Sequence, residues 1–222
     1  MSPTHVFYFE QLYPLQDVAL TLINQQDTGF YLTGGTAVSR VYLHHRFSDD
    51  LDLFANLQPD FGAWCGRVID ALMQDNRWRT EVVMRQQYFA RVLIHQDNVT
   101  LKIEMVNDVP SHIGEIRQHP VLGRIDSPEN ILANKLTALV NREEPRDLAD
   151  VWGLCTRLEL SLADALAGAH SKAAGLYPPD LARRLCTASV KDWELVRWIE
   201  PPVVETYLTE LTALGEGLIL VD

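Results

Sequence analysis

The feature that most constrains the fold is a glycine pair, Gly34-Gly35, which separates an apolar segment from a helical pattern. Residues 30–32 form a short apolar run typical of a strand, and the apolar residues from 37 to 42 recur at the spacing of one helix face. A helix that begins directly after a strand presents unpaired backbone N–H groups, which suit an anion such as phosphate. Thr36 adds a hydroxyl at this point. A simple tight turn before a helix gives the same pattern, and the glycines alone favour that simpler interpretation.

Two acidic residues, Asp50 and Asp52, follow at the start of the next strand candidate, residues 51–54. Residues two apart on a strand face the same side, so the two carboxylates converge while Leu51 points into the core. Neighbouring carboxylates repel unless a cation lies between them, and hard oxygen ligands suit Mg²⁺ or Mn²⁺. A solvated acidic turn is the alternative, and it is the better explanation of Asp49.

A third acid, Glu104, lies in a region whose apolar residues change to the period of strands. The strand candidates are residues 80–85, 88–94 and 99–106, joined by short polar turns, which predicts a meander. In the last segment Leu101 and Ile103 face one side, while Lys102 and Glu104 face the other. An ordinary exposed glutamate fits this position equally well. Together with Asp50 and Asp52, however, Glu104 completes the set of acids that two-metal phosphoryl transfer needs.

A change of character near residue 126 divides the sequence. Helical patterns at residues 12–23 and 64–73 accompany the strands before it. Ser127-Pro128-Glu129 then combines a capping hydroxyl, a proline at the first position and an acid in the first turn of a helix. The remainder is helical, with breaks near residues 145, 175–179 and 201–202. We predict an α+β domain over residues 1–126, with a mixed or antiparallel sheet and flanking helices, and a helical domain over residues 127–222.

Composition narrows the class of protein. The net charge of −11 argues against broad, nonspecific nucleic-acid binding, although a local basic groove is compatible with it. No apolar run approaches the roughly 20 residues of a membrane span, and the N-terminal residues lack a secretory signal pattern. Three scattered cysteines provide neither a disulfide framework nor a zinc motif. A cytoplasmic protein without a membrane segment is therefore expected.

Gly34-Gly35-Thr36 followed by RFSDDLDLF at residues 46–54 resembles the DNA-polymerase-β-like nucleotidyltransferase superfamily. Within it, the chain resembles the AbiEii/AbiGii toxin family of abortive-infection and toxin–antitoxin systems. That family combines Gly-Gly-Ser/Thr with Arg-x-Ser-x-Asp-x-Asp, a helical lysine and Arg-Asp-x-x-Asp. Lys135 and the stretch from Arg146 to Asp150 match the last two motifs. The resemblance covers about residues 30–155. This chain departs from the family pattern in having a glutamate, Glu104, as the third acid.

The resemblance implies an enzyme that moves a nucleoside monophosphate from a triphosphate to an acceptor hydroxyl and releases pyrophosphate. Metal binding would fall to three acids, Asp50, Asp52 and Glu104. Nucleotide binding would fall to Gly34, Gly35, Thr36, Arg46, Lys135 and Arg142. Asp147 would act near the attacking hydroxyl or orient Lys135, and the helical domain would complete the active-site cleft. The resemblance further implies a toxin with a cognate antitoxin, and RNA, especially tRNA, as acceptor.

The later motifs have plain explanations as well. Lys135 and Arg142 lie on one face of a predicted helix, where they could reach a triphosphate or simply be solvated. Arg146 and Asp150 are four residues apart, so a helical salt bridge worth about 0.3–0.5 kcal/mol would also account for them. Asp147 could merely favour a helix start. Two other functions therefore stay open: a small-molecule nucleotidyltransferase, which the acidity favours, and a noncatalytic nucleotide- or partner-binding protein.

Overall fold

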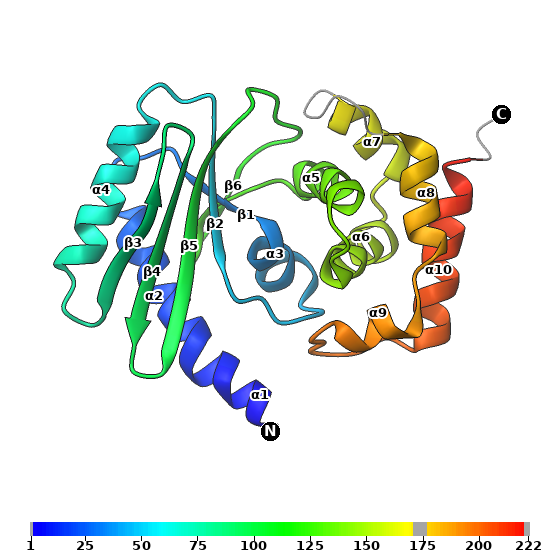
Figure 1. The fold of residues 1–222 in the computed structure, drawn as a ribbon, viewed down its shortest axis with the longest axis horizontal. Coiled ribbons are helices and arrows are strands. Elements are labelled where there is room, and N and C mark those ends of the chain that lie inside the picture. The colour runs from blue at the N-terminus through cyan, green and yellow to red at the C-terminus, as the bar shows by residue number, and fades with distance from the viewer. Residues whose placement is uncertain (1, 171–176, 220–222) are drawn as a thin grey trace. The chain divides into compact units, whose positions relative to one another are not determined.

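A mixed seven-stranded sheet dominates the first half of the computed structural model, which describes residues 2–170 and 177–219 (Figure 1). The strand order is β3-β4-β5-β2-β1-β7-β6. The strands are β1 (Tyr31–Thr33), β2 (Leu51–Asn56), β3 (Arg79–Arg85), β4 (Phe89–Gln96), β5 (Val99–Asp108), β6 (Arg117–His119) and β7 (Gly123–Ile125). The predicted α+β class with a mixed sheet is confirmed. Strands β6 and β7 were not predicted, because three residues are too few to show an alternating pattern.

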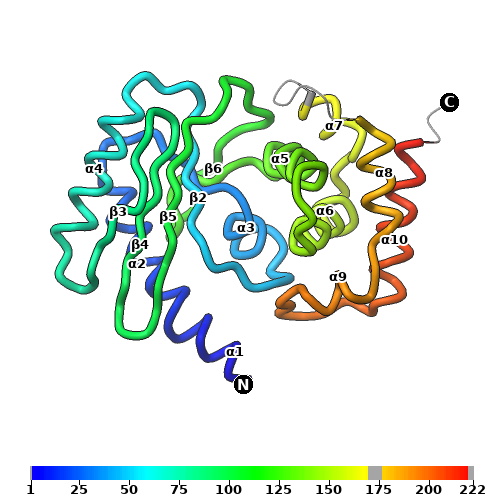
Figure 2. Tube along the Cα trace, in the orientation of Figure 1, coloured from blue at the N-terminus to red at the C-terminus, as the bar shows by residue number. Residues whose placement is uncertain are grey.

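The predicted meander is the antiparallel ribbon β3-β4-β5, whose course Figure 2 traces. β2 joins β5 in parallel and β1 in antiparallel pairing, and β1 continues in parallel to β7. Parallel pairing sets Leu51 opposite Ile103 and Leu53 opposite Met105, all of them buried. One face of the central strands is therefore apolar, and the residues between these pairs, including Asp52, belong to the other face.

Helices flank this sheet. The helices α1 (Pro3–Val6), η1 (Phe7–Leu12, a π-helical segment) and α2 (Tyr13–Asn24) lead to β1, and α4 (Phe61–Gln74) leads to β3. α2 and α4 contact one another, and α4 also contacts β3 and β4. α2 and α4 bury apolar side chains at helical spacing, such as Leu15 and Ala19 in α2 and Phe61 and Cys65 in α4. Both helices were predicted, with ends that differ by one to three residues.

The second half of the chain is helical. Its elements are α5 (Pro128–Asn141), α6 (Pro145–Arg157), α7 (Leu162–His170), α8 (Pro178–Cys186), α9 (Val190–Leu195) and α10 (Val204–Gly217). The Ser127 hydroxyl accepts a hydrogen bond from the Asn130 N–H at 3.1 Å, as the predicted cap requires. Helix breaks occur before Pro145 and around residues 201–202 as predicted, whereas residues 175–176 of the third expected break lie outside the described residues.

Helix α6 is the centre of this helical part, with every residue from Asp147 to Cys155 buried. Trp152 of α6 makes edge-to-face ring contacts with Trp198 and with Tyr207 of α10. Trp198 therefore packs against α6 and α10. No helix among the described residues has the length and apolarity that crossing a membrane would take.

The chain divides into two compact units. Unit 1 comprises Met1–Ala37 and Ser48–Asp126, and unit 2 comprises Val38–Phe47 and Ser127–Asp222. The helical segment that begins as α3 (Gly34–Ala37) continues as η2 (Val38–Leu43), so the boundary falls within it. The sequence suggested one division near residue 126. The structure additionally assigns the ten residues 38–47 to the helical unit, since η2 contacts α5 and α6.

Candidate active site

The glycine turn of unit 1 fits closely against one of the predicted metal acids. β1 ends at Thr33, and Gly34 adopts a left-handed φ of +66°, which favours glycine. A Cβ atom at Gly34 would lie 2.3 Å from Asp52 Oδ2, closer than any side chain tolerates. Gly34 is therefore required both by the backbone turn and by the space that the Asp52 carboxylate needs.

Strand register places two of the acids side by side. Asp52 of β2 lies opposite Glu104 of β5 in parallel pairing, and opposite Thr33 of β1 on its other side. Directly paired residues share a face of the sheet, so the Asp52 and Glu104 side chains emerge on the same side. The sequence predicted the strand face of each acid, and the pairing of β2 with β5 supplies their proximity.

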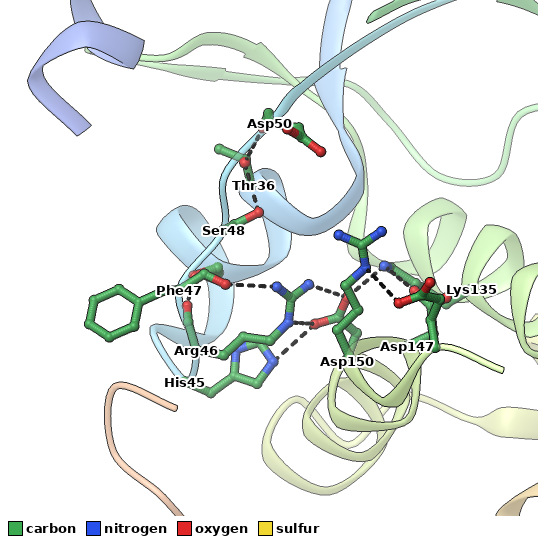
Figure 3. Close-up of polar contacts among 12 residues, drawn as sticks. Thr36, His45, Arg46, Phe47, Ser48, Asp50, Lys135, Asp147 and Asp150 are labelled. Atoms are coloured by element: carbon green, nitrogen blue, oxygen red, sulfur yellow. Dashed lines mark hydrogen bonds and ion pairs between the residues drawn. The ribbon is translucent and has the colours of Figure 1, made fainter. Parts of the chain in front are cut away.

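The loop before β2 is fixed by hydroxyl groups (Figure 3). The Thr36 hydroxyl donates to the Asp50 backbone carbonyl and lies 2.9 Å from the Ser48 hydroxyl. Thr36 is fully buried. Its hydroxyl therefore holds the chain in place ahead of Asp50, which is a different task from the nucleotide contact expected for it.

Residues from the N-terminal helices hold the same loop. The Gln16 side-chain amide donates to the backbone carbonyls of Ser48 and Asp49, at 3.3 and 3.0 Å. The Tyr8 hydroxyl donates to the Asp49 carboxylate. Asp49 is thus bound by a tyrosine, which differs from the solvated turn expected of it. Sequence reasoning missed Gln16, although an amide on the apolar face of a helix is a usable signal for a buried polar contact.

Two cationic side chains, Lys102 and Arg91, contact the candidate metal ligands of unit 1. Lys102 Nζ lies 3.0 Å from Asp50 Oδ2 and 3.3 Å from Glu104 Oε1. Arg91 of β4 approaches Glu104 Oε1 with Nε at 2.7 Å and Nη2 at 2.6 Å. Burial alone would lower the pKa of Lys102, but Asp50 and Glu104 outweigh it and hold the pKa above its usual value. Arg91 was not foreseen, because its position opposite Glu104 is set by strand pairing.

These contacts bear on whether the acids fit a metal. Within residues 2–170 and 177–219, no group of three or more histidine, cysteine or acidic side chains is arranged to hold a metal ion. The chemistry of the donor set nevertheless suits a hard cation, since all three predicted ligands are carboxylates. The ammonium of Lys102 already acts as a cation shared by Asp50 and Glu104. Lys102 and Arg91 together offset two of the three negative charges of Asp50, Asp52 and Glu104.

In unit 2, the other predicted residues meet around two buried aspartates of α6 (Figure 3). Asp150 receives Arg46 Nε on one oxygen and Arg46 Nη2 on the other, each at 2.7 Å. Lys135 Nζ lies 2.6 Å from the same carboxylate, and His45 Nε2 lies 3.0 Å from it. Burial by itself would raise the pKa of Asp150, but the charges of Arg46 and Lys135 hold it well below its usual range.

Asp147 is the second aspartate of α6 that cationic side chains contact. It accepts Lys135 Nζ at 2.7 Å and Arg142 Nε at 2.8 Å. Burial by itself would raise the pKa of Asp147. The charge of Lys135 and the contacts with Arg142 outweigh burial, so the pKa of Asp147 is below its usual value. Lys135 is 8 % exposed, whereas Arg142 is 49 % exposed. Asp147 thus contacts Lys135 directly, and the role of Asp147 in orienting Lys135 stays a prediction.

The contacts of Asp150 bear on two expectations from the sequence, a helical salt bridge with Arg146 and a nucleotide contact of Arg46. The helical salt bridge between Arg146 and Asp150 is wrong: Asp150 faces the core of unit 2, while Arg146 is half-exposed and its Nε lies 3.8 Å from Glu144. Arg46, expected to bind nucleotide, is 3 % exposed and is bonded to Asp150 and to the Phe47 carbonyl. The Arg46 guanidinium is thus bonded within the protein, and its contact with nucleotide stays a prediction.

His45 is a further buried residue of the ionic network around Asp150. Its side chain is fully buried, and burial is the main cause of a pKa below the usual value. A neutral His45 donates its Nε2 proton to Asp150, which leaves Nδ1 as a buried atom without a partner among the described residues. The sequence did not predict this contact, because nothing in the local pattern around His45 marks it as part of an ionic network.

A mixed sheet with paired carboxylates on one face beside a glycine turn defines a protein of nucleotidyltransferase type. The sequence matches the family model described as nucleotidyl transferase AbiEii toxin, type IV TA system, over residues 20–194. The chain therefore belongs to the AbiEii family of nucleotidyltransferase toxins, as the motifs predicted.

Solved structures agree on the fold. JHP933 from Helicobacter pylori aligns with a TM-score of 0.63 and 22 % identity over 98 % of this chain and 93 % of its own. MenT4, a nucleotidyltransferase toxin from Mycobacterium tuberculosis H37Rv, aligns with a TM-score of 0.63 and 16 % identity over 95 % and 84 %. At these identities the likeness concerns the fold alone. The search of curated proteins gave no match.

Proposed function

We propose that this nucleotidyltransferase moves a nucleoside monophosphate to an acceptor hydroxyl with the help of Mg²⁺ or Mn²⁺ bound by Asp50, Asp52 and Glu104. The observation that carries the proposal is the register that sets Asp52 beside Glu104, with Gly34 packed against the Asp52 carboxylate. The metal ions would lower the pKa of the attacking hydroxyl and neutralise charge on the phosphates. The glycines of the turn at Gly34-Gly35 would let a triphosphate approach the backbone closely.

The ionic network of unit 2 supports a phosphate-binding role for its cations. Three cationic side chains, Arg46, Lys135 and Arg142, face two carboxylates, Asp147 and Asp150, so the network carries one positive charge in excess. Arg142 is the most exposed of the three. We assign Arg142 and Lys135 to the nucleotide phosphates, Asp147 to the orientation of Lys135, and Arg46 to the support of Asp150.

The acceptor is proposed to be RNA, and tRNA in particular, within a toxin–antitoxin pair. Membership of a type IV toxin family supports a cognate antitoxin as partner. The RNA acceptor rests on the family resemblance. The net charge of −11 favours the second candidate, a small-molecule acceptor, because a polyanion meets an acidic surface unfavourably.

The deciding experiment incubates the protein and Mg²⁺ with each α-labelled triphosphate in turn, together with total RNA, purified tRNA or a panel of hydroxyl-bearing small molecules. We expect label in the tRNA fraction with one preferred triphosphate. Label in a small molecule, with none in RNA, would transfer the proposal to the second candidate. Absence of pyrophosphate release with every acceptor, in a protein that binds metal and nucleotide, would leave a noncatalytic binding role.

A further inference from the structure

Lys102 has a position among the acids of unit 1 that the proposed function does not use. It lies on β5, two residues before Glu104, and its side chain is on the same face of the sheet. Its ammonium bridges Asp50 Oδ2 at 3.0 Å and Glu104 Oε1 at 3.3 Å. The Lys102 side chain is 31 % exposed, so water reaches it from one side.

The neighbouring cation, Arg91, is arranged differently. Both of its contacts go to Glu104 Oε1, and no contact between Arg91 and Asp50 is found in the described structure. Lys102 is therefore the cation that links Asp50, which directly precedes β2, to Glu104 of β5. Without that link, the negative charges of Asp50 and Glu104 would repel one another more strongly.

We propose that Lys102 is a positioning residue that holds Asp50 and Glu104 together while no metal is bound, and that its ammonium competes with the divalent metal for these two carboxylates. The inference rests on the proposed function, which makes Asp50 and Glu104 metal ligands. Lys102 keeps Asp50 and Glu104 together and offsets part of their negative charge before metal arrives. Metal binding then requires the ammonium to leave the Asp50 and Glu104 oxygens, because two cations repel each other at such separations.

Manganese affinity tests this competition without relying on turnover. Mn²⁺ is titrated into the full-length protein without nucleotide, and free Mn²⁺ is measured by electron paramagnetic resonance. Lys102→Met removes the charge and keeps most of the side-chain volume, while Lys102→Arg keeps the charge. Lys191→Met, an exposed lysine of unit 2, is the matched control.

We expect Lys102→Met to bind Mn²⁺ about three- to tenfold more tightly than wild type, since the two partly exposed ionic contacts of Lys102 together correspond to roughly this factor. Lys102→Arg should stay near wild type, and Lys191→Met should be unchanged. In the absence of metal, Lys102→Met should melt at a lower temperature than wild type, and saturating Mn²⁺ should narrow that difference. Unchanged or weaker Mn²⁺ binding by Lys102→Met overturns the competition.

A further variant separates this inference from the proposed function. Asp52→Asn should reduce Mn²⁺ binding strongly in an otherwise wild-type chain, because it removes a ligand and leaves Lys102 in place. If Asp52→Asn binds Mn²⁺ as wild type does, the proposed metal site itself is wrong. If Asp52→Asn loses binding while Lys102→Met behaves as wild type, the metal site stands and the role of Lys102 alone is refuted. Should Lys102→Met not fold, Lys102→Gln replaces it with the same expected direction.

Discussion

Arg46 and Asp150 are 104 positions apart in the sequence and form a doubly hydrogen-bonded ion pair in which both N–O distances are 2.7 Å. Each belongs to a separate motif, since Arg46 opens the segment that leads to Asp50 and Asp150 ends the Arg-Asp-x-x-Asp signature. The pair lies wholly within unit 2, because residues 38–47 pack with the helices. It therefore ties the chain just ahead of the metal acids to helix α6.

The first prediction concerns the stability of this network. Asp150→Asn should lower the free energy of unfolding by about 3–5 kcal/mol, because it leaves the charges of Arg46 and Lys135 buried without their shared counter-charge. Urea denaturation followed by circular dichroism measures the change. Glu144→Gln, which breaks the long and exposed contact with Arg146, is the control and should change stability by less than about 0.5 kcal/mol. Equal effects of the two substitutions would contradict the structural role of Asp150.

The pH dependence of stability provides the second prediction. The pKa of His45 is lowered in the folded protein, so below about pH 6.5 the unfolded chain takes up a proton that the folded chain resists. Stability should consequently fall as the pH drops from about 6.5 toward the folded pKa. A second loss should follow at more acidic pH, because the depressed pKa values of Asp147 and Asp150 stabilise the fold only while these groups are ionised.

His45→Gln should make the first of these losses shallower while leaving the second in place. Melting temperatures between pH 7.5 and about pH 2 measure both, because the second loss falls below the ordinary aspartate pKa of about 3.9. His44→Asn, at the exposed neighbouring position with its positive φ, is the control and should follow wild type. The assignment is wrong if His45→Gln and wild type lose stability in parallel between pH 6.5 and 5.

The third prediction uses the contact between Gly34 and Asp52. Gly34→Ala should reduce transfer activity by about 100-fold, because the new Cβ would displace the Asp52 carboxylate from its present position. It should also cost about 1–2 kcal/mol of stability, because alanine is strained at this left-handed φ. Gly62→Ala is the matched control, since a Cβ at Gly62 meets no atom within 4 Å. Wild-type activity in Gly34→Ala would remove the argument that this turn positions the acid.

Features set by neighbouring residues could be predicted from the sequence, whereas contacts between distant segments could not. The strand faces of Asp52 and Glu104 could be predicted, because side-chain alternation is local and has a fixed period. Their proximity depends on the parallel pairing of β2 with β5, two strands separated by two other strands in the sequence, and such pairing has no local signature. The ion pair of Arg46 with Asp150 could not be predicted for a similar reason. A cation next to a metal motif was assigned to the nucleotide, whereas the fold brings a buried aspartate from another motif to it.

The last prediction concerns Arg142 and nucleotide binding. Arg142 and Arg146 are similarly exposed arginines, 49 % and 44 %, and they differ in partner: Arg142 is bound to buried Asp147, whereas Arg146 is near exposed Glu144. If the excess charge of the network serves the phosphates, Arg142→Met should weaken the binding of a magnesium–triphosphate by about tenfold, the value of one charge-assisted contact of roughly 1.4 kcal/mol. Arg146→Met should leave it unchanged. Lys135 still contacts Asp147 in the first variant, so the fold should persist, and the melting temperature without nucleotide checks this. Isothermal titration with a nonhydrolysable triphosphate measures the affinity. Equal affinities in both variants would show that Arg142 only supports Asp147, and the phosphate-binding role would then be left to Lys135.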